Sequence, residues 1–426
     1  MREKLFLGIV GDDFTGSSDA ASFAVKAGLK TMLFDGIPAD MDLRAAGVQC
    51  AVIALKSRMA PVKEAQEASL KAALWLKAQG AEHIYSKYCS TFDSTPKGNI
   101  GPILDNFLEK LDVRSSFICP ALPVNGRVVR GGILYINGVP LAESPMKNHP
   151  LTPMWDSRLK NLMEAQSRYP CFEVPAALLY DEAAYKKFIA GLDAEHEHYY
   201  LIPDYTSDED ARMIALRMGN LAVQSGGSGI LTALGELYLG LKPSEGGDES
   251  HMPLSETTGK ALLLAGSCSV ATQTQVANFI KAGHKAVKID APSLMAGALN
   301  VDSLFKEVQD SPSPVLIYST APADEVGALQ KEYGVEKLAT AIEGVMTELT
   351  HRAFKAGFTR YIVAGGETSG AVMRALPADG YLIGKSVAPG VPVMVPSKHP
   401  ALRLVLKSGN FGDPQFFDTA LNFTQL

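Results

Sequence analysis

Apolar runs of strand length recur along this chain, and they limit the folds that it can adopt. In the first half the runs are LFLGIV (5–10), CAVIAL (50–55), HIYSKY (83–88), SFICPAL (116–122), YYLIP (199–203) and GILTAL (229–234). In the second half they are KALLLAGS (260–267), KAVKIDA (285–291), PVLIYST (314–320), RYIVAGG (360–366), PVMVPS (392–397) and LRLVLKSG (402–409). Helical patterns separate several runs, and the clearest, 62–80, ends on Gly80, a residue common after helix C-termini. Near-continuous apolar strands that alternate with helices predict an α/β fold.

The length of the chain predicts two domains, because 426 residues are more than one hydrophobic core usually serves. A polar segment rich in Gly, Ser, Glu and Pro interrupts the alternation near residue 250 and reads as a linker. We therefore place a first domain at 1–240, a linker at 241–258 and a second domain at 259–426. We expect each domain to contain a mainly parallel sheet flanked by helices.

Charge and composition exclude several classes of partner. The formal net charge is −6 and no basic run occurs, which argues against a nucleic-acid partner. No stretch approaches the ~20 apolar residues that a transmembrane helix needs, and the apolar start is too short for a secretory signal. The five cysteines lack a CxxC spacing and lie in or beside apolar runs, which favours reduced, buried thiols: Cys50, Cys89, Cys119, Cys171 and Cys268. These observations predict a cytoplasmic protein with no membrane partner.

The first candidate site follows the first apolar run, in GDDFTGSSD (11–19). Ligands of open parallel sheets bind beyond the C-terminal ends of the strands, where this loop is expected to lie. Asp12 and Asp13, followed by hydroxyls and glycines, could orient a polyol, hold a metal or accept a proton. The alternative is an acidic N-cap on the next helix. Because two aspartates follow a buried strand, we favour the functional interpretation.

The second candidate site is KYCSTFDSTPKGNIG (87–101), in which cations and hydrogen-bond donors are dense enough to recognise a carboxylate or phosphate. Its candidate residues are Lys87, Asp93, Lys97 and Asn99. The alternative is a solvated turn that leads into a helix near Gly101. Arg58, after the second apolar run, could bond a carboxylate through both edges of its guanidinium.

The third candidate site is the proline-rich stretch 120–154, which we expect to be a long loop. A long loop inside a compact domain is more often functional than idle. Its candidate substrate-binding residues are Asn125, Arg127 and His149. A single histidine is more often a surface or core residue than a ligand, although Lys147 and Thr152 surround this one with polar groups.

Three glycine-rich turns follow buried strands in the second half, at 266–269, 365–370 and 408–412. Glycines let backbone amides approach phosphate oxygens, and a following helix N-terminus adds a partial positive charge. We expect a helix from about Ala371. One such turn is weak evidence because glycine turns are common, but three at one edge of a sheet predict a nucleotide phosphate site.

At these residues the sequence resembles the four-carbon acid sugar kinases. The stretches that carry the resemblance span nearly the whole chain: GDDFTGSSDAA (11–21), STFDSTPKGNIG (90–101), PALPVNGR (120–127), ESPMKNHPLTPM (143–154), GSCSVATQTQ (266–275), GGETSGAV (365–372) and LKSGNFG (406–412). The resemblance implies an N-terminal sugar-acid domain and a C-terminal ATP domain. It also implies transfer of the γ-phosphoryl group of ATP to a terminal hydroxyl of a four-carbon acid.

Within the family, KYCSTFDSTPKGNIG looks closest to the branch that phosphorylates the 4-hydroxyl of 3-oxo-tetronate. Branches acting on D-threonate, D-erythronate or 4-hydroxythreonine more typically have Leu-Arg at Pro96-Lys97. D-threonate, D-erythronate and 3-oxo-isoapionate remain alternative substrates within the family. By motif position the residues that match the family's ATP contacts are Ser267, Gly366, Glu367, Thr368, Ser369 and Gly409.

Phosphoryl transfer depends mainly on positioning and on neutralising charge. The hypothesis is that Asp12 or Asp13 accepts the proton of the acceptor hydroxyl, while Arg58, Lys87 and Lys97 bind the carboxylate or screen the moving phosphoryl group. We expect ATP and Mg2+ as cofactors, with no metal ligands assigned. The oligomeric state is left open, a homodimer included. Two rival functions are an NAD-dependent hydroxy-acid dehydrogenase, against which the lack of GxGxxG counts, and a non-catalytic sugar-acid sensor.

Overall fold

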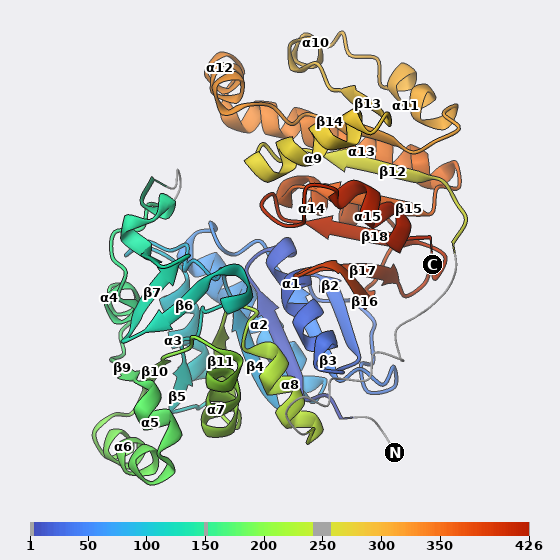
Figure 1. The fold of residues 1–426 in the computed structure, drawn as a ribbon. Coiled ribbons are helices and arrows are strands. Elements are labelled where there is room, and N and C mark those ends of the chain that lie inside the picture. Colours follow the sequence, from blue (N-terminus) through green and yellow to red (C-terminus); the bar gives the residue numbers. More distant parts are fainter. Residues whose placement is uncertain (1–3, 149–151, 242–256, 426) are drawn as a thin grey trace. The chain divides into compact units, whose positions relative to one another are not determined.

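The computed structural model of this chain describes residues 4–148, 152–241 and 257–425 (Figure 1). It divides into two compact units, Met1–His251 and Met252–Leu426. The predicted linker at 241–258 lies almost entirely outside the described residues. In the described part of the chain no helix is both long and apolar enough to cross a membrane.

The main sheet of the first unit contains five strands in the order β11-β4-β1-β3-β2, all parallel to their neighbours. The strands are β1 (Leu7–Gly11), β2 (Thr31–Asp35), β3 (Cys50–Ala54), β4 (His83–Lys87) and β11 (Val223–Gly226). Their apolar residues are almost continuously buried, as expected for a sheet covered on both faces. Parallel pairing brings the C-terminal ends of all five strands to one edge.

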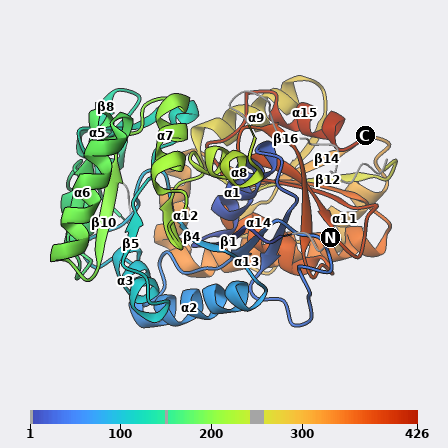
Figure 2. The ribbon, with the colours of Figure 1, turned by 90° about the horizontal axis from the view of Figure 1, so that it is seen from below.

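Helices cover both faces of this sheet (Figure 2). On one face lie α1 (Phe14–Lys26) and α8 (Leu231–Leu239), which pack on each other, and on the other lie α2 (Val62–Ala78) and α3 (Ile100–Lys110). As predicted, α2 ends before Gly80, whose positive φ of 96° favours glycine. The regular βα alternation in the sequence therefore forms the layered α/β arrangement that it predicts.

The rest of the first unit contains two smaller sheets. A parallel sheet in the order β5-β10-β9 consists of β5 (Ser115–Phe117), β10 (Tyr199–Pro203) and β9 (Cys171–Val174). An antiparallel sheet consists of β6 (Arg127–Arg130), β7 (Ile133–Ile136) and β8 (Val139–Pro140). The accompanying helices are α4 (Leu159–Glu164), α5 (Ala176–Tyr180), α6 (Glu182–Glu195) and α7 (Asp208–Met218), with 3-10 turns η1 (Pro123–Asn125), η2 (Leu141–Glu143) and η3 (Pro145–Asn148).

Two expectations for this unit are wrong. The stretch 120–154 is not a long loop, because β6, β7 and β8 pair into a sheet within it. GILTAL (229–234) is not a strand, because its apolar residues begin α8 and the strand β11 precedes it. Short apolar runs fit a buried helix turn as well as a strand, so periodicity alone did not separate the two.

The sheet of the second unit has the order β16-β17-β18-β15-β12-β14-β13. Strands β12 (Ala261–Ala265), β13 (Lys285–Lys288), β14 (Val315–Tyr318), β15 (Arg360–Ala364) and β18 (Arg403–Lys407) run parallel. The hairpin β16 (Tyr381–Ala388) and β17 (Val391–Pro396) is antiparallel, and β17 pairs antiparallel with β18.

Helices again flank the second sheet. Phenylalanines of α9 (Val270–Lys281) and α15 (Phe416–Phe423) form a core with alternate residues of β12, β15 and β18. On these strands the intervening residues point to the other face. There α13 (Val335–Lys355) contacts β12, and α14 (Gly366–Ala375) contacts β15 and β18. The remaining helices are α10 (Ala291–Met295), α11 (Val301–Gln309) and α12 (Ala323–Tyr333). The helix that we expected to start near Ala371 is α14, and it starts five residues earlier, at Gly366.

All five cysteines are free thiols, as predicted, and three of them are buried. Cys89 and Cys268 are only partly buried, because each lies in a loop that follows a strand.

Candidate functional site

In the first unit, charged side chains gather where β1, β3 and β4 end. Asp12 and Asp13 follow β1, Arg58 lies in the loop after β3, and Lys87 is the last residue of β4. Backbone hydrogen bonds fix these loops to one another: the Asp12 N–H donates to the Lys87 carbonyl, and the Ser57 and Arg58 N–H groups donate to the Asp12 carbonyl. The parallel register of the strands thus brings together residues that are far apart in the sequence.

The Arg58 guanidinium bonds both aspartates. Its Nε and Nη2 atoms each donate to one oxygen of Asp12 at 2.8 Å, and Nη2 lies 2.8 Å from Asp13 Oδ2. The other oxygen of Asp13 accepts from the Gly16 N–H at 2.5 Å, so Asp13 is also the N-cap of α1. The structure therefore bears out the N-cap interpretation for Asp13, while the functional interpretation of the two aspartates stays a prediction.

Burial and ion pairing act in opposite directions on the pKa values of Asp12 and Arg58. Burial raises the pKa of the Asp12 carboxyl, and the charge and hydrogen bonds of Arg58 oppose that rise. Burial also disfavours the charged form of Arg58, but the two aspartates outweigh it and raise the pKa of the guanidinium well above its usual value. The bidentate geometry keeps Arg58 charged and fixed at the strand ends.

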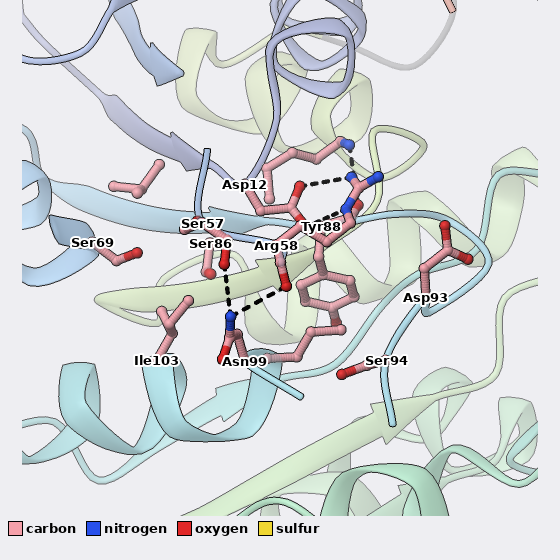
Figure 3. A pocket seen from close by; sticks show the side chains of 13 residues that line it. Asp12, Ser57, Arg58, Ser69, Ser86, Tyr88, Asp93, Ser94, Asn99 and Ile103 are labelled. Carbon is pink, nitrogen blue, oxygen red and sulfur yellow. Dashed lines mark hydrogen bonds and ion pairs between the residues drawn. The ribbon is translucent and has the colours of Figure 1, made fainter. Parts of the chain in front are cut away.

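A pocket with about 380 Å³ of empty space, part of it open to solvent, lies beside this cluster (Figure 3). Its lining combines two cations, two carboxylates and several hydroxyls, groups that can bond a small polar ligand. Its walls come from β1, β4, α2, α3 and the loops after β1, β3 and β4. The lining residues are Val10, Asp12, Ser57, Arg58, Ser69, Ser86, Lys87, Tyr88, Asp93, Ser94, Asn99, Ile100 and Ile103.

Asn99 holds one wall of the pocket in place. Its Nδ2 atom donates to the carbonyls of Ser57 and Arg58 at 2.7 and 3.2 Å (Figure 3). It also donates to the Ala60 carbonyl at 2.8 Å. Its Oδ1 atom is buried and has no hydrogen-bond partner in the described structure. Asn99 therefore fixes the loop that carries Arg58 and leaves one acceptor for a ligand.

Asp19 is a further buried carboxylate that was not among the predicted site residues. It lies in α1, accepts a hydrogen bond from the Ser228 hydroxyl, and its Oδ1 atom is buried without a partner in the described structure. Burial raises its pKa to about 6, and the charges of Lys87 and Arg127 oppose this rise. The sequence signal for Asp19 was its place in the motif GDDFTGSSD, in the second turn of α1.

Of the other predicted residues of this unit, one lines the pocket and three do not. Asp93 lines the pocket and accepts from the Thr91 hydroxyl at 2.5 Å. Lys97 is exposed on its turn and does not line the pocket. Asn125, at the end of η1, and Arg127, the first residue of β6, are partly buried and do not line the pocket either. His149 lies outside the described residues.

In the second unit the three glycine turns follow β12, β15 and β18, which are adjacent and parallel. The turns approach one another closely. A Cβ on Gly266 would overlap Thr368 Oγ1, and a Cβ on Gly409 would overlap Ser267 Oγ. The Ser269 hydroxyl, at the N-cap of α9, donates to the Gly409 carbonyl at 2.6 Å. A side chain larger than hydrogen at Gly266 or Gly409 would therefore displace the Thr368 or Ser267 hydroxyl.

The N-terminus of α14 is open to a ligand. Its N-cap is Gly365, at φ 130°, so no side chain satisfies the first N–H groups of the helix. Gly366 and Glu367 are exposed in the first turn, whereas Thr368 and Ser369 are buried, and the Ser369 hydroxyl has no partner in the described structure. Unsatisfied N–H groups at a helix N-terminus, beside two further glycine turns, fit an anionic phosphate group.

Comparisons with known proteins agree with this division into two sites. Residues 7–234 match a family model described as a sugar-binding N-terminal domain, and residues 262–417 match one described as a nucleotide-binding C-terminal domain. A 3-oxo-tetronate kinase of Brucella melitensis is 40% identical over 417 residues, which cover 96% of this chain and 94% of the relative. A 3-oxo-tetronate kinase of Haemophilus influenzae is 39% identical and covers 97% of this chain and 98% of the relative. This chain belongs to the four-carbon acid sugar kinase family.

Solved structures of relatives share the fold of this family member. A crystal structure from Salmonella typhimurium has a TM-score of 0.86 at 37% identity, and it covers 98% of both chains. A crystal structure from Haemophilus influenzae has a TM-score of 0.81 at 38% identity and covers 98% of this chain and all of the other.

As a member of a kinase family, the chain is an enzyme that takes a sugar acid and ATP. The family assignment excludes the two rival functions, the dehydrogenase and the non-catalytic sensor. It assigns no role to any single residue, so the predicted site residues remain predictions.

Proposed function

We propose that this kinase transfers the γ-phosphoryl group of ATP to the 4-hydroxyl of 3-oxo-tetronate. The observation that carries the proposal is the identity of 38 to 40% over almost the full chain with several relatives of that name. The geometry is consistent with it, because one unit has a small pocket lined by cations and carboxylates and the other has an open anion site. We also propose the domain division 1–240 and 259–426, with the acid in the first domain and ATP in the second.

Within the pocket we propose that Arg58 and Lys87 bind the substrate carboxylate or screen charge, since both are held rigidly at strand ends. Asp12 lines the pocket, so we assign it the acceptance of the hydroxyl proton, which burial favours by raising its pKa. Asp13 then acts mainly by holding Arg58 and the start of α1. Ser267, Gly366, Glu367, Thr368, Ser369 and Gly409 are the proposed ATP contacts.

Mg2+ would accompany ATP, and the donors that the chain offers fit a cation held largely by phosphate and water. In the described ranges no group of three or more His, Cys, Asp or Glu side chains could hold a metal by itself. Mg2+ usually takes one or two protein carboxylates and keeps several waters. Glu367, exposed in the first turn of α14, is the carboxylate that we propose for it. The bound ion would neutralise phosphate charge.

The direct test is ADP release from purified enzyme with ATP, Mg2+ and a panel of acids: 3-oxo-tetronate, D-threonate, D-erythronate, their L-forms and 3-oxo-isoapionate. We expect the highest kcat/KM with 3-oxo-tetronate. A higher value with another acid would reassign the substrate within the family, and ADP release with none of them would contradict the proposed acceptor.

Replacement of each aspartate separates their roles. Asp12→Asn should lower kcat by a factor of 100 or more, because general-base catalysis typically contributes about 10²- to 10⁴-fold. Asp13→Asn should reduce kcat less, since Asn is also a good N-cap but bonds Arg58 without charge. Turnover of Asp12→Asn equal to that of the wild type, with the fold intact, would remove Asp12 from the acid–base role.

A further inference from the structure

Lys407 is a fully buried lysine at the end of β18 in the nucleotide-binding unit, with an exposed fraction of 0%. Strand alternation puts it on the same face as Val405, which packs in the core formed with α9 and α15. Its ammonium group lies 5.6 Å from the centre of the Phe416 ring. The strand thus directs a cation into an apolar core, next to the glycine turn 408–412.

All three N–H donors of the ammonium group have acceptors, and none is a carboxylate. Nζ donates to the Ser408 carbonyl at 3.0 Å, to the Gly409 carbonyl at 2.9 Å and to the Thr272 hydroxyl at 3.0 Å. Among the described residues no acidic side chain forms an ion pair with it. Buried charges are normally paired, because an uncompensated charge inside a protein is costly.

These bonds set the direction of the glycine turn. The Gly409 carbonyl also accepts from the Ser269 and Thr272 hydroxyls, at 2.6 and 2.9 Å. Because the N–H of a peptide unit points opposite to its C=O, the N–H groups of Gly409 and Asn410 point away from Lys407. Neither N–H has a hydrogen-bond partner in the described structure. The turn therefore presents two free donors beside Ser267.

We propose that Lys407 is a positioning residue for the nucleotide: it orients the N–H groups of the 408–410 turn toward a phosphate, whose negative charge balances the buried cation. The inference rests on the proposed function, since it requires a nucleotide at this turn. Lys407 acts through the turn and does not itself touch the phosphate.

The buried charge of Lys407 should also couple nucleotide binding to proton uptake. Burial lowers the pKa of this lysine to about 7, and no neighbouring charge contributes to the shift. The charged groups on the elements packed against β18 bond elsewhere or are exposed: Arg360 on β15, Arg374 and Glu367 on α14, Asp418 on α15 and Lys281 on α9. A phosphate beside the turn favours the charged form, so nucleotide binding above pH 7 draws a proton onto the lysine.

The test is calorimetric titration of the full chain with ADP and Mg2+, for the wild type, Lys407→Met and the control Lys385→Met. Lys385 is an exposed lysine on β16 of the same unit. We expect Lys407→Met to bind ADP about 10- to 100-fold more weakly, as for the loss of hydrogen bonds from a charged group. Lys385→Met should bind as the wild type does, and KM for the sugar acid should not change in either variant.

Titration at pH 8 in buffers of different ionisation enthalpy measures proton uptake. The wild type should take up more protons per ADP than Lys407→Met, a difference that a purely structural lysine would not produce. Equal ADP affinity and equal proton uptake in the two would overturn the inference. If the wild type itself binds no ADP, the proposed function fails first, and the two failures are distinguishable.

Thr272→Val provides a second variant in case Lys407→Met does not fold. Valine keeps the shape of threonine and removes one acceptor of Lys407 together with one donor to the Gly409 carbonyl. We expect ADP binding several-fold weaker with the fold retained, and wild-type affinity in this variant would count against the proposal.

Discussion

At the scale of single residues, the charged cluster of the first unit is held together by the Arg58 guanidinium, which bonds two adjacent carboxylates. Asp12 and Arg58 expose only 13% and 24% of their side chains, so water screens their interaction weakly. The charged residues and their order along the chain were readable from the sequence. That Arg58 bonds both aspartates was not, because the pairing depends on β1 and β3 becoming neighbours.

Replacement of Arg58 tests how much its bonds to the two aspartates contribute to stability and activity. Arg58→Met leaves two adjacent carboxylates without their partner, and we expect a loss of about 3 kcal/mol in the free energy of unfolding, as for other broken buried pairs. Arg58→Lys should retain part of the stability but lose activity, because an ammonium cannot bond both oxygens of Asp12 in the fork geometry. Urea unfolding and kcat/KM measure the two effects. Lys71→Met, an exposed lysine on α2, is the matched control and should change neither.

Asp19 predicts an unusual pH dependence. Between about pH 4 and 6 the folded protein keeps the Asp19 proton that the unfolded chain has released, so the folded state binds more protons. The free energy of unfolding therefore falls as pH rises through this window, by about 3 kcal/mol from this group, and the cost persists above pH 6. Asp19→Asn should lack this contribution. Urea unfolding at pH 4.5 and 7.5 checks it, and an identical pH slope in the variant would contradict the assignment.

At the scale of elements, the proposed nucleotide site consists of strand ends and the loops that follow them. The sequence predicted three glycine turns at one edge, and the adjacent parallel strands β12, β15 and β18 do bring those turns together. Prediction failed where elements were short or irregular. The strands β6 to β8 and the strand β2 have no long apolar run, and their pairing depends on tertiary structure.

Gly266→Ala tests whether close approach of the turns is required. The added Cβ would overlap Thr368 Oγ1 at the start of α14, so we expect KM for ATP to rise about tenfold while the fold remains. The double variant with Thr368→Ala should recover part of the loss, because it removes the clashing atom. Gly344→Ala is the control: it lies in α13 with open space around it and should stabilise the protein by about 0.5–1 kcal/mol. Unchanged KM in Gly266→Ala would show that the turns have room to separate.

At the scale of the whole molecule, each of the two compact units contains its own strands, helices and buried apolar residues. We therefore expect a ligand to stabilise mainly the unit to which it binds. Hydrogen exchange with and without ADP and Mg2+ measures this. We expect protection at 266–269, 365–370 and 408–412, and none in the main sheet of the first unit. Protection confined to the first unit would reverse the proposed assignment of ATP.

The sequence by itself determined the α/β class, two domains, the strand ends where function was expected and the family resemblance. These follow from local periodicity and from motifs that are contiguous in the chain. Only the tertiary structure decided that Arg58 bonds both aspartates and that Asp19 is buried beside Ser228. It also decided that Lys97 faces solvent and that the Lys407 ammonium bonds the Gly409 carbonyl. Such facts depend on which strands become neighbours, and the order β11-β4-β1-β3-β2 is not the order of the chain. Burial and pairing arise from that order, so the pKa of a side chain cannot be read from its place in the sequence.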